Sequence, residues 1–135
     1  EAGKLTRILQ EFDHPFAHRS LEWDVAQGTW TFQLKHMFND EQIEIINVFQ
    51  SEFESNQEKY SSLRKSIVHS DVNDNNIIVS GNLISPHVEG IIDFGDAVFT
   101  HTINDLAIAV SYAVMNKPDA LNAALPVVDA SLCHS

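Results

Sequence analysis

The fold is decided by residues 66–96, which read SIVHSDVNDNNIIVSGNLISPHVEGIIDFGD. Apolar residues 67–68 predict the end of a strand, and residues 69–75 form a polar loop. Two further apolar runs, 77–79 and 88–92, predict a pair of strands. Polar side chains therefore gather where strands end, which is where catalytic and binding groups are commonly placed.

The two later strands are expected to form a hairpin. Ser80-Gly81-Asn82 favours a turn, because glycine and asparagine tolerate positive φ and asparagine bonds its own backbone. The hairpin would bring Asn76 near Asp93, so that Asp71, Asn76 and Asp93 face one another. Their oxygens suit a hard cation such as Mg²⁺, which needs only one or two protein ligands plus substrate phosphates. Asp71 would then be free to receive or orient a hydroxyl proton.

These residues resemble the aminoglycoside phosphotransferase and choline kinase group of small-molecule kinases, distant relatives of the protein kinases. His69-Ser70-Asp71, followed after four residues by Asn76, is similar to the group's catalytic loop. Residues 92–96, Ile-Asp-Phe-Gly-Asp, are similar to its metal-binding segment, and residues 105–107, Asp-Leu-Ala, to the start of its next helix. The run 71–76 most resembles the hydroxylysine kinase-like branch. Ser70 departs from the pattern, since most members have glycine there.

The resemblance implies an α+β fold, namely the larger, C-terminal lobe of a protein kinase-like enzyme, mostly helical with a small β-hairpin. It implies transfer of the γ-phosphoryl group of ATP or GTP, with Mg²⁺, to a hydroxyl of a small, amine-bearing molecule. Asp71 would be the base or hydroxyl-positioning group, and Asn76 and Asp93 the magnesium ligands. His69 and Asp105 would support the site, Asp105 by holding the backbone of the catalytic loop.

Each of these residues also has a purely structural interpretation. Aspartate and asparagine are common in loops because they form Asx turns, so His69-Ser70-Asp71 could be turn chemistry alone. Asp105 could complete a capping box with Thr102, three residues earlier, and this interpretation is compatible with a role in the loop. The combination of five positions in one strand-loop-strand pattern favours the catalytic interpretation.

Composition narrows the class of partner. The net charge is −11 with only eight Lys and Arg, whereas nucleic acids and anionic membranes bind basic surfaces. Cationic ligands such as amines are favoured instead. The single Cys133 excludes an internal disulfide and a multi-cysteine metal site, which suits a reducing cytoplasm. No apolar run approaches the length needed to cross a membrane.

The flanking segments are predicted to be helical from apolar spacing. Before the central stretch, helices are expected at residues 4–12, from Asp13-His14-Pro15 to Trp23, at 30–38 after a break at Gly28, and from an Asn39–Gln42 capping box to about residue 64. His14 and His18 are four residues apart, but without a third ligand they are taken as surface histidines. After it, an apolar helix at 106–115 is expected to be buried against the hairpin, and a last helix begins at Pro118 and is interrupted at Pro126.

The whole chain is interpreted as a partial larger lobe: a helical segment (1–65), the catalytic loop and metal-binding hairpin (66–96) and the following helices (97–135). The glycine-rich loop and strand lysine of a nucleotide-binding lobe do not occur in the 135 residues. The expectation is therefore a fragment that is inactive in isolation and that self-associates through uncovered apolar surface.

Two other functions are compatible with the sequence. The chain could be a non-catalytic, pseudokinase-like interaction module, because the nucleotide clamp does not occur in it. It could also be a metal-dependent phosphate hydrolase built on His69, Asp71 and Asp93, although such a centre would need more ligands than this loop offers.

Overall fold

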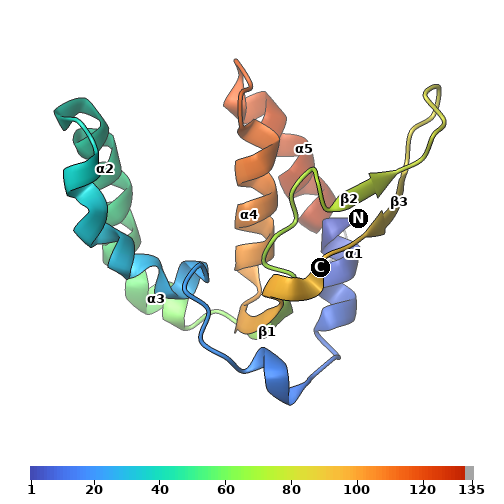
Figure 1. Cartoon of the computed structure of the whole chain (residues 1–135), viewed down its shortest axis with the longest axis horizontal. Coiled ribbons are helices and arrows are strands. Elements are labelled where there is room, and N and C mark those ends of the chain that lie inside the picture. Colours follow the sequence, from blue (N-terminus) through green and yellow to red (C-terminus); the bar gives the residue numbers. More distant parts are fainter. Residues whose placement is uncertain (133–135) are drawn as a thin grey trace.

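The computed structural model describes residues 1–132, so Cys133 lies outside the described residues. The chain is mostly helical with two small antiparallel sheets, and the predicted mixed α+β class is confirmed (Figure 1). The helices are α1 (Ala2–Leu9), η1 (Pro15–Ala17), η2 (Val25–Met37), α2 (Asp40–Ser55), α3 (Gln57–Ser61), η3 (Phe94–Asp96), α4 (Ile103–Val114) and α5 (Ala120–Leu132), where η marks 3₁₀ geometry.

Four short strands form the two sheets. β1 (Lys65–Val68) pairs with β4 (Val98–His101), and β2 (Ile77–Val79) pairs with β3 (Val88–Ile91), both antiparallel. The hairpin of β2 and β3 was predicted, whereas β4 was not. Only four residues long, β4 has no strong period of its own, and its pairing partner lies more than thirty residues earlier in the chain.

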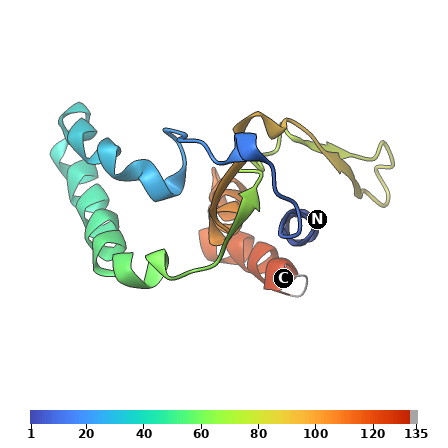
Figure 2. The same ribbon diagram turned by 90° about the horizontal axis from the view of Figure 1, so that it is seen from below.

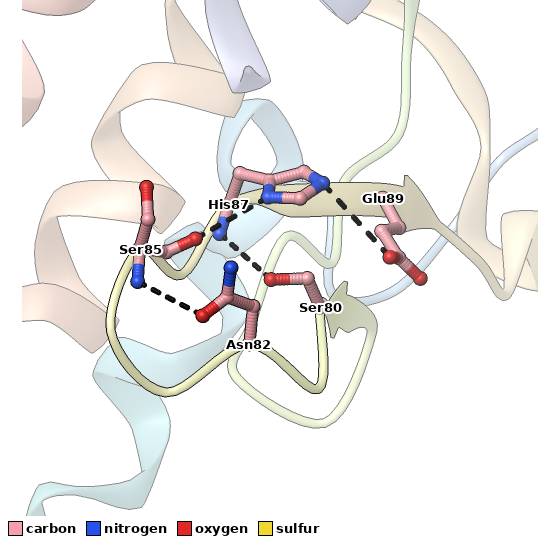
Figure 3. Close-up of polar contacts among 5 residues, drawn as sticks. All are labelled: Ser80, Asn82, Ser85, His87 and Glu89. Atoms are coloured by element: carbon pink, nitrogen blue, oxygen red, sulfur yellow. Dashed lines mark hydrogen bonds and ion pairs between the residues drawn. The ribbon is translucent and has the colours of Figure 1, made fainter.

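The connection between β2 and β3 is held by its own polar groups, as Figure 3 shows. Asn82 Oδ1 accepts hydrogen bonds from the backbone N–H groups of Ile84 (3.0 Å) and Ser85 (3.3 Å). Ser80 Oγ accepts from the backbone N–H of His87 at 3.2 Å. The predicted side-chain hydrogen bonds of residues 80–82 are therefore present, within a longer loop that projects from the body of the molecule (Figure 1). The expected positive φ is not, since neither Gly81 nor Asn82 adopts it.

The buried centre lies around β1, β4 and the start of α4. Its apolar members are Leu9, Ala17, Ile67, Val68, Val72 and Val98. The largest fully buried side chains also include the polar residues His69, Asn104 and Asp105. Because buried polar groups are costly unless they are hydrogen-bonded, this centre depends on specific polar pairing as well as on apolar packing.

Helix α2 has the predicted capping box. Asn39 Oδ1 accepts from the N–H of Gln42 at 2.9 Å, and Gln42 Oε1 accepts from the N–H of Asn39 at 3.1 Å. The helix ends at Ser55, short of the predicted residue 64, and Asn56 separates it from α3. No residue of α2 is buried, and the helix stands apart from α4 in both views (Figures 1 and 2). Self-association through the uncovered apolar surface of the hairpin and of residues 106–115 stays a prediction.

The predicted helix from Asp13 to Trp23 is wrong. Only the single turn η1 forms; His14 Nδ1 accepts from the N–H of Phe16 (3.3 Å), and the Phe16 and Trp23 side chains are exposed. The predicted break at Gly28 is also wrong, because this glycine lies inside η2. The first helix begins and ends earlier than predicted, since α1 runs from Ala2 to Leu9 and not over residues 4–12.

The C-terminal helices differ from the prediction in their packing. Helix α4 begins at Ile103, packs mainly against α5 and also contacts α1, and buries only Asn104 and Asp105. The prediction that this helix is buried against the hairpin is therefore wrong. Pro126 does not interrupt α5, which runs through it. Within residues 1–132, every helix is too short or too polar to cross a membrane.

Candidate active site

His69 joins the candidate catalytic loop to the segment after β3. It follows β1 directly and is fully buried. Its Nδ1 accepts a hydrogen bond from the backbone N–H of Asp71 (3.3 Å), so Nε2 is the protonated nitrogen and donates to the carbonyl of Ile92 at 2.9 Å. The ring also packs on Phe94, with centroids 4.7 Å apart. One side chain thus ties two loops that are separated by more than twenty residues.

Asp105 holds the backbone at the beginning of the same loop. Its carboxylate accepts from the N–H groups of His69 (3.3 Å) and Ser70 (2.9 Å) and from the hydroxyl of Thr6 (3.3 Å). Burial raises the pKa of the Asp105 carboxyl, and the hydrogen bonds from Ser70 and His69 act against that rise. Ser70 has φ 67°, a left-handed conformation that favours glycine, and these contacts maintain it.

The alternative role of Asp105 in a capping box is not present. The Thr102 side chain makes no cap hydrogen bond, and its hydroxyl instead pairs with that of Ser66 at 2.9 Å. Asp105, in the first turn of α4, therefore accepts hydrogen bonds from the catalytic loop and does not cap its own helix.

Two amide side chains hold the carboxylate of Asp71. Asn76 Nδ2 donates to Asp71 Oδ2 at 2.8 Å and to the Asp71 carbonyl at 2.9 Å. Asn73 Nδ2 donates to Asp71 Oδ1 at 2.8 Å. Asn73 Oδ1 in turn accepts from the N–H groups of Asn75 (2.8 Å) and Asn76 (3.2 Å), which closes the loop on itself. Asn73 was not among the predicted site residues, because its spacing matched no motif.

Asp93 lies beside Asn76 through the backbone. The N–H of Ile92 donates to the carbonyl of Asn76 at 3.0 Å, immediately before Asp93. Asp93 is left-handed (φ 62°, ψ 72°), and its Oδ1 accepts from the N–H of Gly95 at 3.2 Å. A Cβ on Gly95 would come within 3.1 Å of that oxygen, so glycine suits this turn.

A pocket of about 450 Å³ opens beside Asp71, within the size range of small-molecule sites. Three parts of the chain line it: Trp23 and Val25; Ser70, Asp71 and Asp96; and Ile108, Ser111, Tyr112 and Met115. The last four have the i, i+3, i+4, i+7 spacing of one helical face. Sequence analysis missed this face, because it treated the apolar helix as buried.

Comparison with protein families matches residues 1–129 to the family described as "Phosphotransferase enzyme family". The chain belongs to this phosphotransferase family. Hydroxylysine kinases are similar over most of its length: 29% identity for mouse, 26% for Danio rerio and 28% for Xenopus laevis, covering 89%, 94% and 90% of the chain. The chain spans 35%, 38% and 36% of those relatives, about a third of their length. The family resemblance predicted from residues 66–107 is confirmed.

A phosphotransferase of this family uses a divalent cation, and the oxygen atoms available here fit Mg²⁺. Within residues 1–132, Asn76 Oδ1 and Asp93 Oδ2 accept no hydrogen bond and come from adjacent points of the hairpin. Magnesium is typically held by one or two such oxygens together with substrate phosphates. In the same part of the chain, no three His, Cys, Asp or Glu side chains cluster in a way that could hold a metal. A hydrolase centre of His69, Asp71 and Asp93 is therefore not supported.

The two other histidines considered at the sequence level do not form a metal pair. His18 Nε2 lies 2.6 Å from Asp13 Oδ1, and the His18 ring stacks on Phe99 with centroids 4.5 Å apart. The hydrogen bond with His18 lowers the pKa of the Asp13 carboxyl, while His14 caps its own short turn. These are surface and packing roles.

Proposed function

We propose that this phosphotransferase chain contributes to transfer of the γ-phosphoryl group of ATP or GTP to a hydroxyl of a small, amine-bearing molecule. One observation carries the proposal: the Asp71 carboxylate borders a small-molecule-sized pocket and also accepts a hydrogen bond from Asn76, which lies beside Asp93. Acceptor and cation sites would then lie on either side of one carboxylate. Phosphoryl transfer needs this kind of positioning more than it needs a protein nucleophile.

The roles follow from the contacts. Asp71 would accept the proton of the acceptor hydroxyl as its oxygen attacks the γ-phosphorus and the bond to the nucleoside diphosphate breaks. The hydrogen bonds from Asn73 and Asn76 fix the carboxylate, so little reorganisation is needed when the hydroxyl arrives. Asn76 and Asp93 would hold Mg²⁺, which when bound neutralises charge on the phosphates. His69 and Asp105 would position the loop.

The acceptor class is supported by charge and by similarity. The chain has a net charge of −11, which favours a cationic acceptor over an anionic one, and the relatives are named hydroxylysine kinases. We therefore propose an alcohol that also bears an amine. The finer assignment of the chain as part of the larger lobe of a kinase-like enzyme, acting in the cytoplasm, belongs to the same proposal.

The test is Asp71→Asn in protein expressed from the complete coding sequence, with Asp74→Asn as the matched control. Asp74 is an exposed carboxylate in the same loop, and within residues 1–132 its side chain makes no hydrogen bond or ion pair. Asp71→Asn should lower turnover by about a hundredfold or more while magnesium-nucleotide binding is retained. Undiminished turnover would refute the role of Asp71.

A non-catalytic interaction module is the competing function, motivated by the missing glycine-rich loop in these 135 residues. Calorimetry of the 135-residue polypeptide with magnesium and ATP tests the interpretation that a second lobe is required for nucleotide binding. Micromolar binding would contradict that interpretation. Binding by the protein from the complete coding sequence, without turnover of any amino alcohol, would favour the interaction module.

A further inference from the structure

The pocket beside Asp71 has an unusual chemical composition. Two carboxylates, Asp71 and Asp96, border it together with the aromatic rings of Trp23 and Tyr112, and no Lys, Arg or His is among its lining residues. Within residues 1–132, neither carboxylate forms an ion pair with a basic side chain. Negative charge beside aromatic faces favours an organic cation, through charge pairing and cation–π attraction, and disfavours an anion.

The backbone around Asp96 is anchored from a distant segment. Arg19 donates from Nη2 to the carbonyls of Gly95 and of Ala97 (3.3 Å for the latter), the two residues that flank Asp96. Asp96 is the last residue of η3, which begins directly after Asp93. The guanidinium therefore bonds to the turn's backbone and leaves the Asp96 carboxylate available to a ligand. A carboxylate on an anchored turn loses less freedom when it binds.

We infer that Asp96, with Trp23 and Tyr112, forms the subsite for the ammonium group of the acceptor. This rests on the proposed phosphotransferase function. With the hydroxyl at Asp71 and the cationic nitrogen at Asp96, one molecule would span the two carboxylates of a single pocket. Asp96 is then a specificity-determining residue, distinct from the groups that act on the phosphates.

The test uses two probes of the same shape, 2-aminoethanol and its uncharged isostere propan-1-ol. Their binding to the protein expressed from the complete coding sequence is measured by ligand-observed NMR, and phosphoryl transfer by release of the nucleoside diphosphate. The wild type should bind 2-aminoethanol more tightly than propan-1-ol. Asp96→Asn should weaken binding of 2-aminoethanol about tenfold or more, as for loss of one charge-assisted contact, and leave propan-1-ol unchanged.

Two matched pairs of variants separate recognition from folding. Trp23 is 64% exposed, so its replacement should be tolerated; Trp23→Leu should weaken binding of 2-aminoethanol, whereas Trp23→Phe keeps an aromatic face and should retain it. The control for Asp96→Asn is Asp119→Asn, which changes an exposed carboxylate before α5. This control should bind 2-aminoethanol as the wild type does.

The outcomes distinguish the two proposals. Equal binding of the two probes by the wild type, no binding of 2-aminoethanol, or an Asp96→Asn variant that binds it as well as the wild type would each overturn the ammonium subsite. If 2-aminoethanol binds in an Asp96-dependent way but no acceptor is phosphorylated, the subsite is supported and the proposed catalytic function fails.

Discussion

Replacing Asp105 by alanine should destabilise the chain and release the catalytic loop. The carboxylate is 2% exposed and accepts hydrogen bonds from the N–H groups of His69 and Ser70 and from the Thr6 hydroxyl. Alanine would leave two backbone donors without an acceptor, at about 1 to 3 kcal/mol each. Removing a buried carboxylate returns part of that cost, so we expect a net loss of about 2 to 4 kcal/mol in the free energy of unfolding.

A loss of that size is a large fraction of the total for a small domain, which is about 5 to 15 kcal/mol. Urea denaturation followed by circular dichroism measures it, with unchanged m values as the condition for comparing midpoints. Asp105→Asn keeps one acceptor oxygen and should lose less than Asp105→Ala. Asp129→Ala, an exposed carboxylate on α5, is the control and should stay within about 0.5 kcal/mol of the wild type. If Asp105→Ala matched this control, the anchoring role of the carboxylate would be refuted.

Three further predictions concern other positions. Ser70→Gly should raise the free energy of unfolding by up to about 1 kcal/mol, and the thermal midpoint with it, because glycine adopts φ 67° without strain; a lower midpoint would contradict this. Tyr60→Phe should cost about 1 kcal/mol in urea denaturation, since it removes the donor to the buried Asn104 Oδ1 (2.9 Å), whereas Tyr112→Phe should be near neutral. Burial lowers the pKa of His101 from its ordinary value of 6.5, so the unfolded chain binds this proton more readily than the folded chain does. The free energy of unfolding should therefore fall as the pH drops through about 6.5. If it fell as steeply with pH in His101→Phe as in the wild type, this cause would be excluded.

The local chemistry of residues 66–96 could be predicted from the sequence. Strands β2 and β3, the turn after Val79 and the polar loop between His69 and Asn76 all follow from apolar runs and from Asx chemistry. The capping box of α2 is equally local, because its two hydrogen bonds join residues three apart. The resemblance to a phosphotransferase family used the same stretch together with residues 105–107.

The pocket could not be predicted in the same way. Its carboxylates lie in the central stretch, but Trp23 and Tyr112 belong to segments that the sequence pattern described only as apolar. Exposure of an aromatic side chain depends on which neighbours the chain brings to it, and periodicity does not report neighbours. The exposure of α2 could not be predicted for the same reason. Its apolar spacing is that of a helix, yet the side chains of Ile45, Val48 and Phe49 are exposed in the structure.

The sequence by itself determined the phosphotransferase family, the hairpin and the oxygen-rich loop, since each depends on motifs or apolar runs that can be read within residues 66–107. Only the tertiary structure decided that β4 pairs with β1, that Thr6 also donates to Asp105 and that α4 lines a pocket beside Asp71. The physical reason is that these contacts join segments tens of residues apart. Their formation depends on chain closure and mutual burial, which leave no periodic trace in either segment alone.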